Sequence, residues 1–193
     1  MLSQSDPLPL RPQRIVVAGV SGVGKSTLAL RIADVLGLPY TEIDALFHGP
    51  EWVPRPTFLA EVTELAAAPA WVTEWQYAPA REVLAARADL MVWLDLGTGT
   101  TMRRVILRTA GRRARRTELW NGNVEGSLWA SFTSTDGIVR WAFATRHAYR
   151  RRVPDLVARR PDLDVVQLRT QRDVDEWLEG PLAAAAASGS PRE

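Results

Sequence analysis

The chain has 193 residues, of which 46% are hydrophobic and 24% charged, with a formal net charge of +2, as expected for one soluble globular domain with a full core. The absence of cysteine excludes disulfides, thiolate metal sites and thiol redox chemistry. No apolar stretch approaches the roughly 20 residues of a membrane span, and the first dozen residues lack the hydrophobic core of a signal peptide. We expect a cytoplasmic protein with one domain over residues 13–180 and flexible tails at 1–12 and 181–193.

The first predicted unit is a strand, a glycine-rich loop and a helix. A β-branched apolar run at residues 14–18 predicts a buried parallel strand. Residues 19–27 read Gly-Val-Ser-Gly-Val-Gly-Lys-Ser-Thr and match the phosphate-binding pattern G-x-x-x-x-G-K-[ST]. Apolar residues at helical spacing follow, and Gly37 predicts the end of that helix. The loop and the helix N-terminus should therefore surround one anion; the alternative is a chance glycine-rich loop.

Lys25 is the only lysine among the 24 Lys and Arg residues. A compact ammonium at this position is expected to bridge the β- and γ-phosphates of a nucleoside triphosphate. The Ser26 hydroxyl should ligate Mg²⁺, so the predicted cofactors are ATP and Mg²⁺. The residues expected to contact the nucleotide are Gly19, Ser21, Gly22, Val23, Gly24, Lys25, Ser26 and Thr27.

Strands and helices alternate along the rest of the domain. Strands are predicted at residues 14–18, 39–44, 71–75, 90–95 and 163–168, with helices at 57–65, 79–88 and 98–110, within 127–160 and around 174–178. This alternation predicts an α/β three-layer sandwich, a five-stranded parallel sheet with helices on both faces. In such sheets ligands bind beyond the carboxyl ends of the strands.

Two acidic residues end predicted strands on the side of the phosphate-binding loop. Asp44 could accept the proton of an acceptor hydroxyl or orient the acceptor; the alternative is an acid that caps a turn. Glu74 could serve as the acid that holds a magnesium-bound water, and the alternative is an edge residue paired with an arginine. Asp95 also ends a strand, and we expect a structural role for it.

Arginine is concentrated in the second half of the chain. Residues 1–100 hold 7 basic and 11 acidic side chains, a balance of −4, whereas residues 101–193 hold 17 and 11, a balance of +6. Arg108, Arg112 and Arg116 recur every four residues, so on a helix they would share one face. We predict that they bind the transferred phosphoryl group from an arginine-rich helical lid at about 108–126, with Arg146 and Arg150 as weaker candidates. A solvated arginine face is the alternative.

Aromatic residues gather in the segments that connect the predicted strands. A flat acceptor could stack on them. The predicted acceptor-binding aromatic residues are Phe47, Trp52, Trp75 and Tyr77, with Trp120 in the same set.

The chain resembles the adenylate-kinase-related DNA topology modulation proteins over about residues 14–178. The resemblance rests on residues 19–27, Ile-Asp-Ala-Leu-Phe at 43–47 with Trp52, Trp-Val and Tyr77 at 71–77, Val-Trp-Leu-Asp at 92–95, Glu-Leu-Trp-Asn-Gly-Asn at 118–123 with Glu125, and Arg-His-x-x-Arg-Arg-Arg at 146–152. It implies a fold like that of nucleoside monophosphate kinases, with an arginine-bearing lid. The chain departs from the family where Glu74-Trp75-Gln76 replaces Asp-Gly-Asn and where Val124 replaces an arginine.

These features together predict an ATP- and Mg²⁺-dependent phosphotransferase. Its acceptor would be a nucleoside, a nucleotide or a small hydroxylated metabolite. ATP is the expected donor because the guanine-reading motif N-K-x-D would require a second lysine. The alternative is a nucleotide-gated nucleic-acid-binding protein, whose arginine clusters would hold a phosphate backbone and whose affinity would fall steeply with salt. The sequence leaves the oligomeric state open.

Overall fold

The computed structural model describes residues 1–114 and 147–189, and of residues 108–114 only the backbone. Four parallel strands form one sheet in the order β2-β1-β3-β4. Their bounds are β1 (Arg14–Gly19), β2 (Trp71–Glu74), β3 (Leu90–Leu94) and β4 (Asp164–Leu168). The central strands β1 and β3 are buried almost throughout, which explains their uninterrupted apolar sequences.

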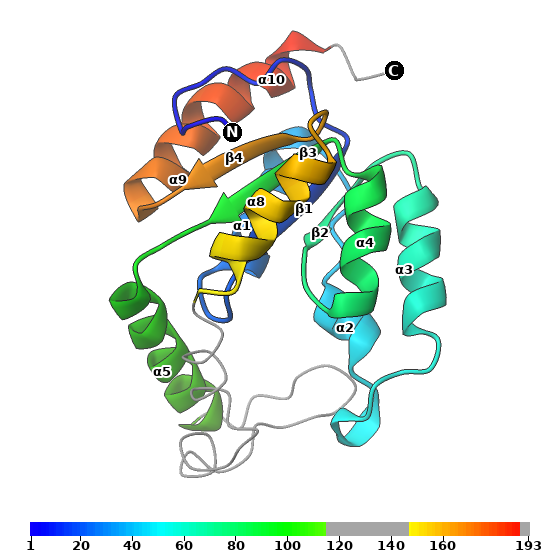
Figure 1. Ribbon diagram of the computed structural model, residues 1–193. Coiled ribbons are helices and arrows are strands. Elements are labelled where there is room, and N and C mark those ends of the chain that lie inside the picture. The colour runs from blue at the N-terminus through cyan, green and yellow to red at the C-terminus, as the bar shows by residue number, and fades with distance from the viewer. Residues whose placement is uncertain (115–146, 190–193) are drawn as a thin grey trace.

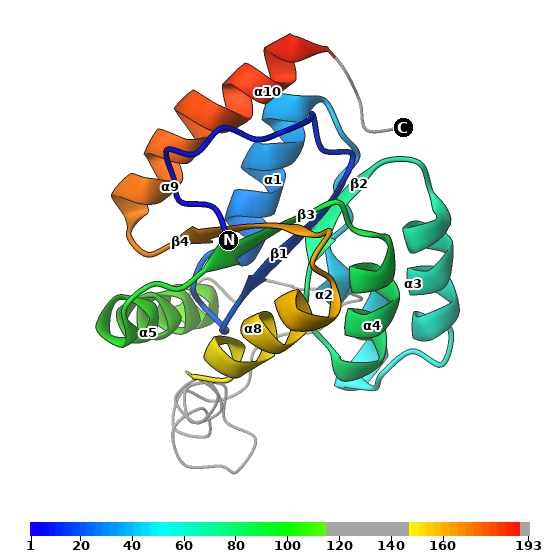
Figure 2. The same cartoon turned by 45° about the horizontal axis from the view of Figure 1, so that its top comes forward.

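Helices cover both faces of the sheet. Their bounds are α1 (Lys25–Leu36), α2 (Ile43–Phe47), α3 (Phe58–Ala67), α4 (Ala78–Arg87), α5 (Thr98–Ala114), α8 (Tyr149–Arg159), α9 (Gln171–Trp177) and α10 (Ala183–Ser188), with a 3-10 turn η1 (Pro50–Trp52) and a π-helical turn η3 (Leu178–Leu182). Figures 1 and 2 show α1, α9 and α10 on one face of the sheet and α4 and α8 on the other. The predicted three-layer α/β architecture is therefore confirmed.

The predicted strand at 39–44 is reduced to a single bridge beside β2. Tyr40 pairs with Val72, and the chain then turns into α2 at Ile43. The reason is a buried carboxylate, because Glu74 accepts the Ile43 amide proton at 3.0 Å and so begins a helix where a longer strand was expected. Within the described residues the sheet therefore has four strands, where five were predicted.

The segments predicted as flexible tails pack against the domain in their described parts. Leu2 exchanges hydrogen bonds with Val165 and Gln167 at 2.7 and 3.0 Å, so the N-terminal segment lies along the free edge of β4. Leu182 and Ala185 are buried near the other end of the chain. Contacts of apolar side chains with the core, such as those of Leu2, Leu8 and Leu182, stabilise this packing.

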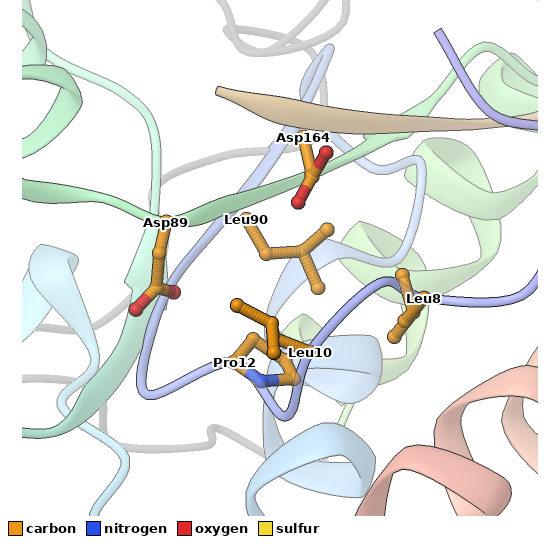
Figure 3. A pocket seen from close by; sticks show the side chains of 6 residues that line it. All are labelled: Leu8, Leu10, Pro12, Asp89, Leu90 and Asp164. Atoms are coloured by element: carbon orange, nitrogen blue, oxygen red, sulfur yellow. The ribbon is translucent and has the colours of Figure 1, made fainter. Parts of the chain in front are cut away.

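The N-terminal segment also covers the amino-terminal edge of the sheet. A small pocket there, shown in Figure 3, is lined by Leu8, Leu10, Pro12, Asp89, Leu90 and Asp164. Leu90 and Asp164 are the first residues of β3 and β4. This pocket therefore lies at the end of the sheet where the strands begin, opposite the end that carries the glycine-rich loop. Among the described residues, no helix has both the length and the apolar character needed to cross a bilayer.

Candidate functional site

The glycine-rich loop connects the carboxyl end of β1 to the first turn of α1. Gly19, Gly22 and Gly24 all have positive φ, at 152°, 75° and 108°. A side chain at Gly22 would also place its Cβ 2.1 Å from Cγ2 of Val105, on α5. A Cβ at Gly19 would lie 2.8 Å from Cγ1 of Val23. Glycine is therefore required at Gly19 and Gly22 both by the backbone conformation and by close packing.

We expect Gly22→Ala to destabilise the folded protein by at least about 2 kcal/mol, because left-handed backbone and overpacking each cost about 1 kcal/mol or more. Gly99→Ala is the matched control on α5, where a Cβ would meet nothing within 4 Å. Thermal and urea unfolding of the two variants measures the difference. Equal stability of the two variants would contradict the packing argument.

Lys25 is the first residue of α1 and lies over the loop. Its side chain is only 8% exposed, and its Nζ donates to the carbonyl of Val20 at 3.2 Å. No side chain caps α1 at Gly24, and its first turn carries no acid. The amide groups of the turn and the ammonium thus present one cluster of donors, which fits the phosphates of a nucleotide.

Arg104, on α5, holds the same loop from the other side. Its Nη1 donates to the Val23 carbonyl at 2.8 Å, and its Nη2 donates to Oε1 of Gln171 at 2.8 Å. Arg104 is not among the arginines predicted to bind phosphate, although it stands four residues before Arg108 and so continues the predicted repeat. Arg104 therefore joins the loop to α5 and to the start of α9.

Asp44 lies in α2, with its carboxylate held by residues that follow β2. The side-chain amide of Gln76 donates to Asp44 Oδ1, and the Tyr77 hydroxyl donates to the same oxygen at 2.7 Å. Within the described part of the chain, Oδ2 of Asp44 has no hydrogen-bond partner. One carboxylate oxygen is thus fixed, and the other can accept a proton or a hydrogen bond from a ligand.

Glu74 is buried, at 1% exposure, with both carboxylate oxygens in use. Oε1 accepts from the Tyr40 hydroxyl at 2.7 Å and Oε2 from the Ile43 amide. Burial, with the charge of Glu74 next, raises the pKa of Tyr40, and a hydrogen bond from Ser26 works in the opposite direction. In this arrangement the two carboxylate oxygens of Glu74 are occupied by Tyr40 and Ile43.

Magnesium would find one protein ligand in this loop, the Ser26 hydroxyl. Within the described residues, no group of three or more His, Asp or Glu side chains could hold a metal ion. A hydroxyl ligand supplemented by phosphate oxygens and water suits Mg²⁺, which keeps several waters and binds through few side chains. The residues present therefore fit a magnesium ion that arrives with a nucleotide.

Aromatic residues surround Asp44, but they largely contact one another. The rings of Phe47 and Tyr77 stack at 3.8 Å, and Phe58 meets both rings edge-on. Trp52 packs edge-on against His48 and is 37% exposed. Among the non-glycine residues described, those with positive φ are Glu51, Trp52 and Tyr77, so this cluster also holds strained backbone.

The prediction that Trp75 stacks on an acceptor does not agree with its position. Trp75 is 2% exposed, its indole donates to the Arg81 carbonyl at 2.9 Å, and its ring packs against Tyr149. β2 is a buried strand, and the residue that follows it continues into the core. Trp75 therefore supports the site from beneath, and of the two tryptophans of the predicted set that the structure describes, Trp52 is the exposed one.

His48 completes the contacts of Tyr77. Its Nε2 lies 3.0 Å from the Tyr77 hydroxyl, whose own proton is donated to Asp44, so the arrangement requires the tautomer with a proton on Nε2. Burial lowers the pKa of His48 below its ordinary value of 6.5, against the opposing effect of Asp44. Burial, with Asp44 next, raises the pKa of Tyr77.

We expect His48 to make the fold sensitive to mild acid. Because the folded state lowers its pKa, the unfolded state binds the proton more readily, and stability falls as the pH drops below about 6.5. His48→Gln should flatten the dependence of Tm on pH between pH 7.5 and 5.5. The exposed His147 is the other histidine of the chain, and His147→Gln is the control. An unchanged slope in His48→Gln would show that other groups cause it.

Of the arginines predicted to bind phosphate, Arg150 is the one whose side chain the structure describes. Arg150 makes an ion pair with Asp95 at 2.9 Å, and Gln167 donates to the other oxygen of Asp95. Arg108 and Arg112 lie on α5, where the structure describes the backbone alone. Arg116, Trp120 and Arg146 lie outside the described residues, as do Val124 and the predicted lid beyond residue 114.

No family model matches the chain. A shikimate kinase from Caulobacter vibrioides is 51% identical over 39 residues, which are 20% of this chain and 20% of that protein. A cytidylate kinase from Nitratidesulfovibrio vulgaris is 47% identical over 38 residues, 20% of this chain and 16% of that protein. The chain thus matches about a fifth or less of the length of these curated relatives.

Solved structures resemble the whole fold. A gluconokinase from Sinorhizobium meliloti superposes with a TM-score of 0.54 at 23% identity and covers 94% of this chain and 95% of its own. A shikimate kinase from Acinetobacter baumannii in complex with shikimate gives a TM-score of 0.50 at 19% identity, covering 93% and 90%. The chain therefore has the α/β fold of these P-loop kinases.

Proposed function

We propose that this protein is an ATP-dependent phosphotransferase acting on a small molecule. One observation carries the proposal: the lysine-bearing phosphate loop and Asp44, which has one open carboxylate oxygen, lie at the same end of the sheet. The loop follows the carboxyl end of β1, and Asp44 is held by Tyr77, which follows the carboxyl end of β2. In Figure 1, α2 with Asp44 and α5, which packs on the loop, both lie at the lower end of the molecule. Phosphoryl transfer needs donor and acceptor held together in this way.

Each residue then has a defined task. The amide groups of residues 22–26 and the Lys25 ammonium bind the phosphates of ATP and stabilise the charge on the transferred group. Asp44 Oδ2 orients the acceptor and takes its hydroxyl proton as the acceptor oxygen bonds to the γ-phosphorus and the bond from that phosphorus to ADP breaks. Ser26 would hold Mg²⁺, which neutralises charge on the phosphate oxygens when it is bound.

Glu74 and Tyr40 support Ser26 in this proposal. The Tyr40 hydroxyl is fixed by Glu74, and the Ser26 side chain acts on the pKa of Tyr40. If the Ser26 hydroxyl donates its proton to the Tyr40 oxygen, the lone pairs of Ser26 remain available to the metal. Hydrogen bonds to a ligating side chain orient it in this way at many metal sites. Glu74 thus keeps its predicted part in magnesium binding, but acts through Tyr40.

The comparisons bear on the chemical class of the phosphate acceptor. The relatives with the matching stretches are a shikimate kinase and a cytidylate kinase, and the similar structures include a gluconokinase. These names, together with the resemblance to DNA topology modulation proteins, support an acceptor that offers a hydroxyl or a phosphate oxygen. Within the described part of the arginine clusters, Arg150, Arg159 and Arg160 each pair with an acid.

Production of ADP from MgATP tests the proposal. The purified protein is assayed with separate pools of nucleosides, nucleoside monophosphates, sugars and hydroxy acids. Acceptor-dependent ADP release in one pool is the expected result, and division of that pool identifies the substrate. Tight MgATP binding without stimulation by any pool would contradict the proposal and favour a nucleotide-gated nucleic-acid-binding protein.

A further inference from the structure

We propose that Arg81 and Arg152 form a binding site for an anionic group on the acceptor, so that the substrate is a carboxylate or a phosphate ester. The inference rests on the proposed function, because it assigns the charge class of the molecule that Asp44 orients. Two arginines from different helices lie over the two rings of one aromatic pair, Trp75 and Tyr149, and the residue after Trp75, Gln76, donates to that aspartate.

Trp75 and Tyr149 hold the two arginines. The rings lie 5.9 Å apart, edge to face, and the Tyr149 hydroxyl donates to the Trp75 carbonyl at 2.8 Å. The guanidinium carbon of Arg81 lies 5.9 Å from the Trp75 ring centre, and that of Arg152 lies 5.8 Å from the Tyr149 ring centre. The aromatic faces fix both guanidinium groups while leaving their N–H donors for another ligand.

The helices place both cations where a cation is least favourable. Arg81 is the fourth residue of α4, and Arg152 is the fourth residue of α8. Neither helix carries an acid in its first turn. Because a helix N-terminus is partly positive, an arginine there is unfavourable unless an anion binds nearby. Figures 1 and 2 both show α4 and α8 side by side on one face of the sheet.

Carboxylates do not neutralise these arginines within the described residues. Other arginines of the same region do pair: Arg150 with Asp95, Arg159 with Glu82 and Arg160 with Asp162. Neither Arg81 nor Arg152 has an acid within 4.0 Å in that part of the chain. Burial lowers the pKa of Arg81, and repulsion from the charge of Arg152 is the second cause.

The two arginines are linked to Asp44 through the residue that follows Trp75. Gln76, which follows Trp75, donates to Asp44 Oδ1, and the charge of Asp44 acts on Tyr149. A small molecule could therefore place an anionic group on the two arginines while its acceptor oxygen meets Asp44 Oδ2. Each planar guanidinium matches the paired oxygens of a carboxylate or a phosphate. Neutral sugars and nucleosides would lack this contact.

Steady-state kinetics test the inference once an acceptor pool is active. Arg81→Gln and Arg152→Gln should each raise the KM of the acceptor about 10- to 100-fold, since each removes a hydrogen bond to a charged group, and should leave the KM of MgATP unchanged. Arg159→Gln is the matched control, an exposed arginine of α8 paired with Glu82. Phosphorylation of a neutral acceptor, with wild-type KM in both variants, would overturn the inference and leave the proposed kinase activity intact.

A binding measurement keeps the test independent of turnover. Saturating MgADP fills the phosphate loop, and Tm is then measured with hydroxycarboxylates, with phosphate esters and with their neutral counterparts. We expect one of the two anionic sets to raise Tm in the wild type and not in the Arg81→Gln/Arg152→Gln double variant, which also distinguishes carboxylate from phosphate. A stabilisation that the double variant retains, or stabilisation by neutral compounds alone, would refute the site.

Discussion

Lys25→Ala should lower kcat/KM for phosphoryl transfer by about 100- to 1000-fold, the usual cost of losing one donor aimed at transition-state charge. The reason is the position of the ammonium, which is 8% exposed and is held above the loop at 3.2 Å from the Val20 carbonyl. Loss of a single side chain from the start of α1 should leave the fold intact, since alanine is a good helix former. Kinetics with the identified acceptor, together with thermal unfolding, measure both effects.

Lys25→Arg is the informative companion variant. It keeps the charge but replaces a compact ammonium with a wide planar fork, and we expect it to be nearly as impaired as the alanine variant. Activity close to that of wild type would mean that any positive charge suffices at this position. Normal MgATP affinity in Lys25→Ala would contradict the assigned role altogether.

The composition of the chain allows a chemical version of the same test. Because one lysine occurs among the 24 Lys and Arg residues, an amine-directed reagent can modify only Lys25 and the N-terminal amine. MgATP should slow modification of Lys25 but not of Met1, and mass spectrometry would distinguish the two. Equal protection of both amines, or of neither, would indicate that the nucleotide does not cover Lys25.

Asp44→Asn should lower kcat by about 100- to 10,000-fold with little change in the KM of MgATP, the range found when a general base is removed. Asparagine can keep its Oδ1 toward Gln76 and Tyr77, so the side chain should hold its orientation. The open oxygen would become an amide nitrogen, which donates a hydrogen bond and cannot take a proton.

Steady-state kinetics with the identified acceptor measure this change. Asp34→Asn is the matched control, because Asp34 is an exposed residue of α1. An unaltered kcat together with an unaltered KM of the acceptor in Asp44→Asn would show that Asp44 only caps a turn, the alternative that its sequence context left open. A raised KM of the acceptor with unaltered kcat would restrict Asp44 to orientation of the substrate.

Several parts of the site could be predicted because they depend on neighbouring residues. The apolar run before the loop predicts β1, and the pattern of residues 19–27 predicts the loop, in which Gly19, Gly22 and Gly24 have positive φ. The spacing of apolar residues predicts α1 up to Gly37, which has the left-handed conformation expected at a helix end. In each case the pattern and the structure concern contiguous residues.

Other parts of the site could not be predicted from neighbouring residues. Trp75 follows a strand in the manner of a ligand-binding residue, yet its ring lies in the core against Tyr149, 74 residues later in the chain. Glu74 has the sequence position of a magnesium-associated acid, yet Tyr40 and Ile43 occupy both of its oxygens. These outcomes depend on which element packs on the end of β2.

The phosphate loop, its lysine and the alternating architecture can be derived from the amino-acid sequence alone, because they follow from backbone preferences and from periodicity along the chain. Three further features come from the packing of distant segments: Gln76 and Tyr77 fix one oxygen of Asp44, Arg104 holds the loop, and Arg81 and Arg152 lie over the paired rings of Trp75 and Tyr149. The hydrogen bonds in this set join residues about 30 to 80 positions apart. Hydrogen bonds and charge interactions of such range depend on how helices and strands pack in space, which no local pattern specifies.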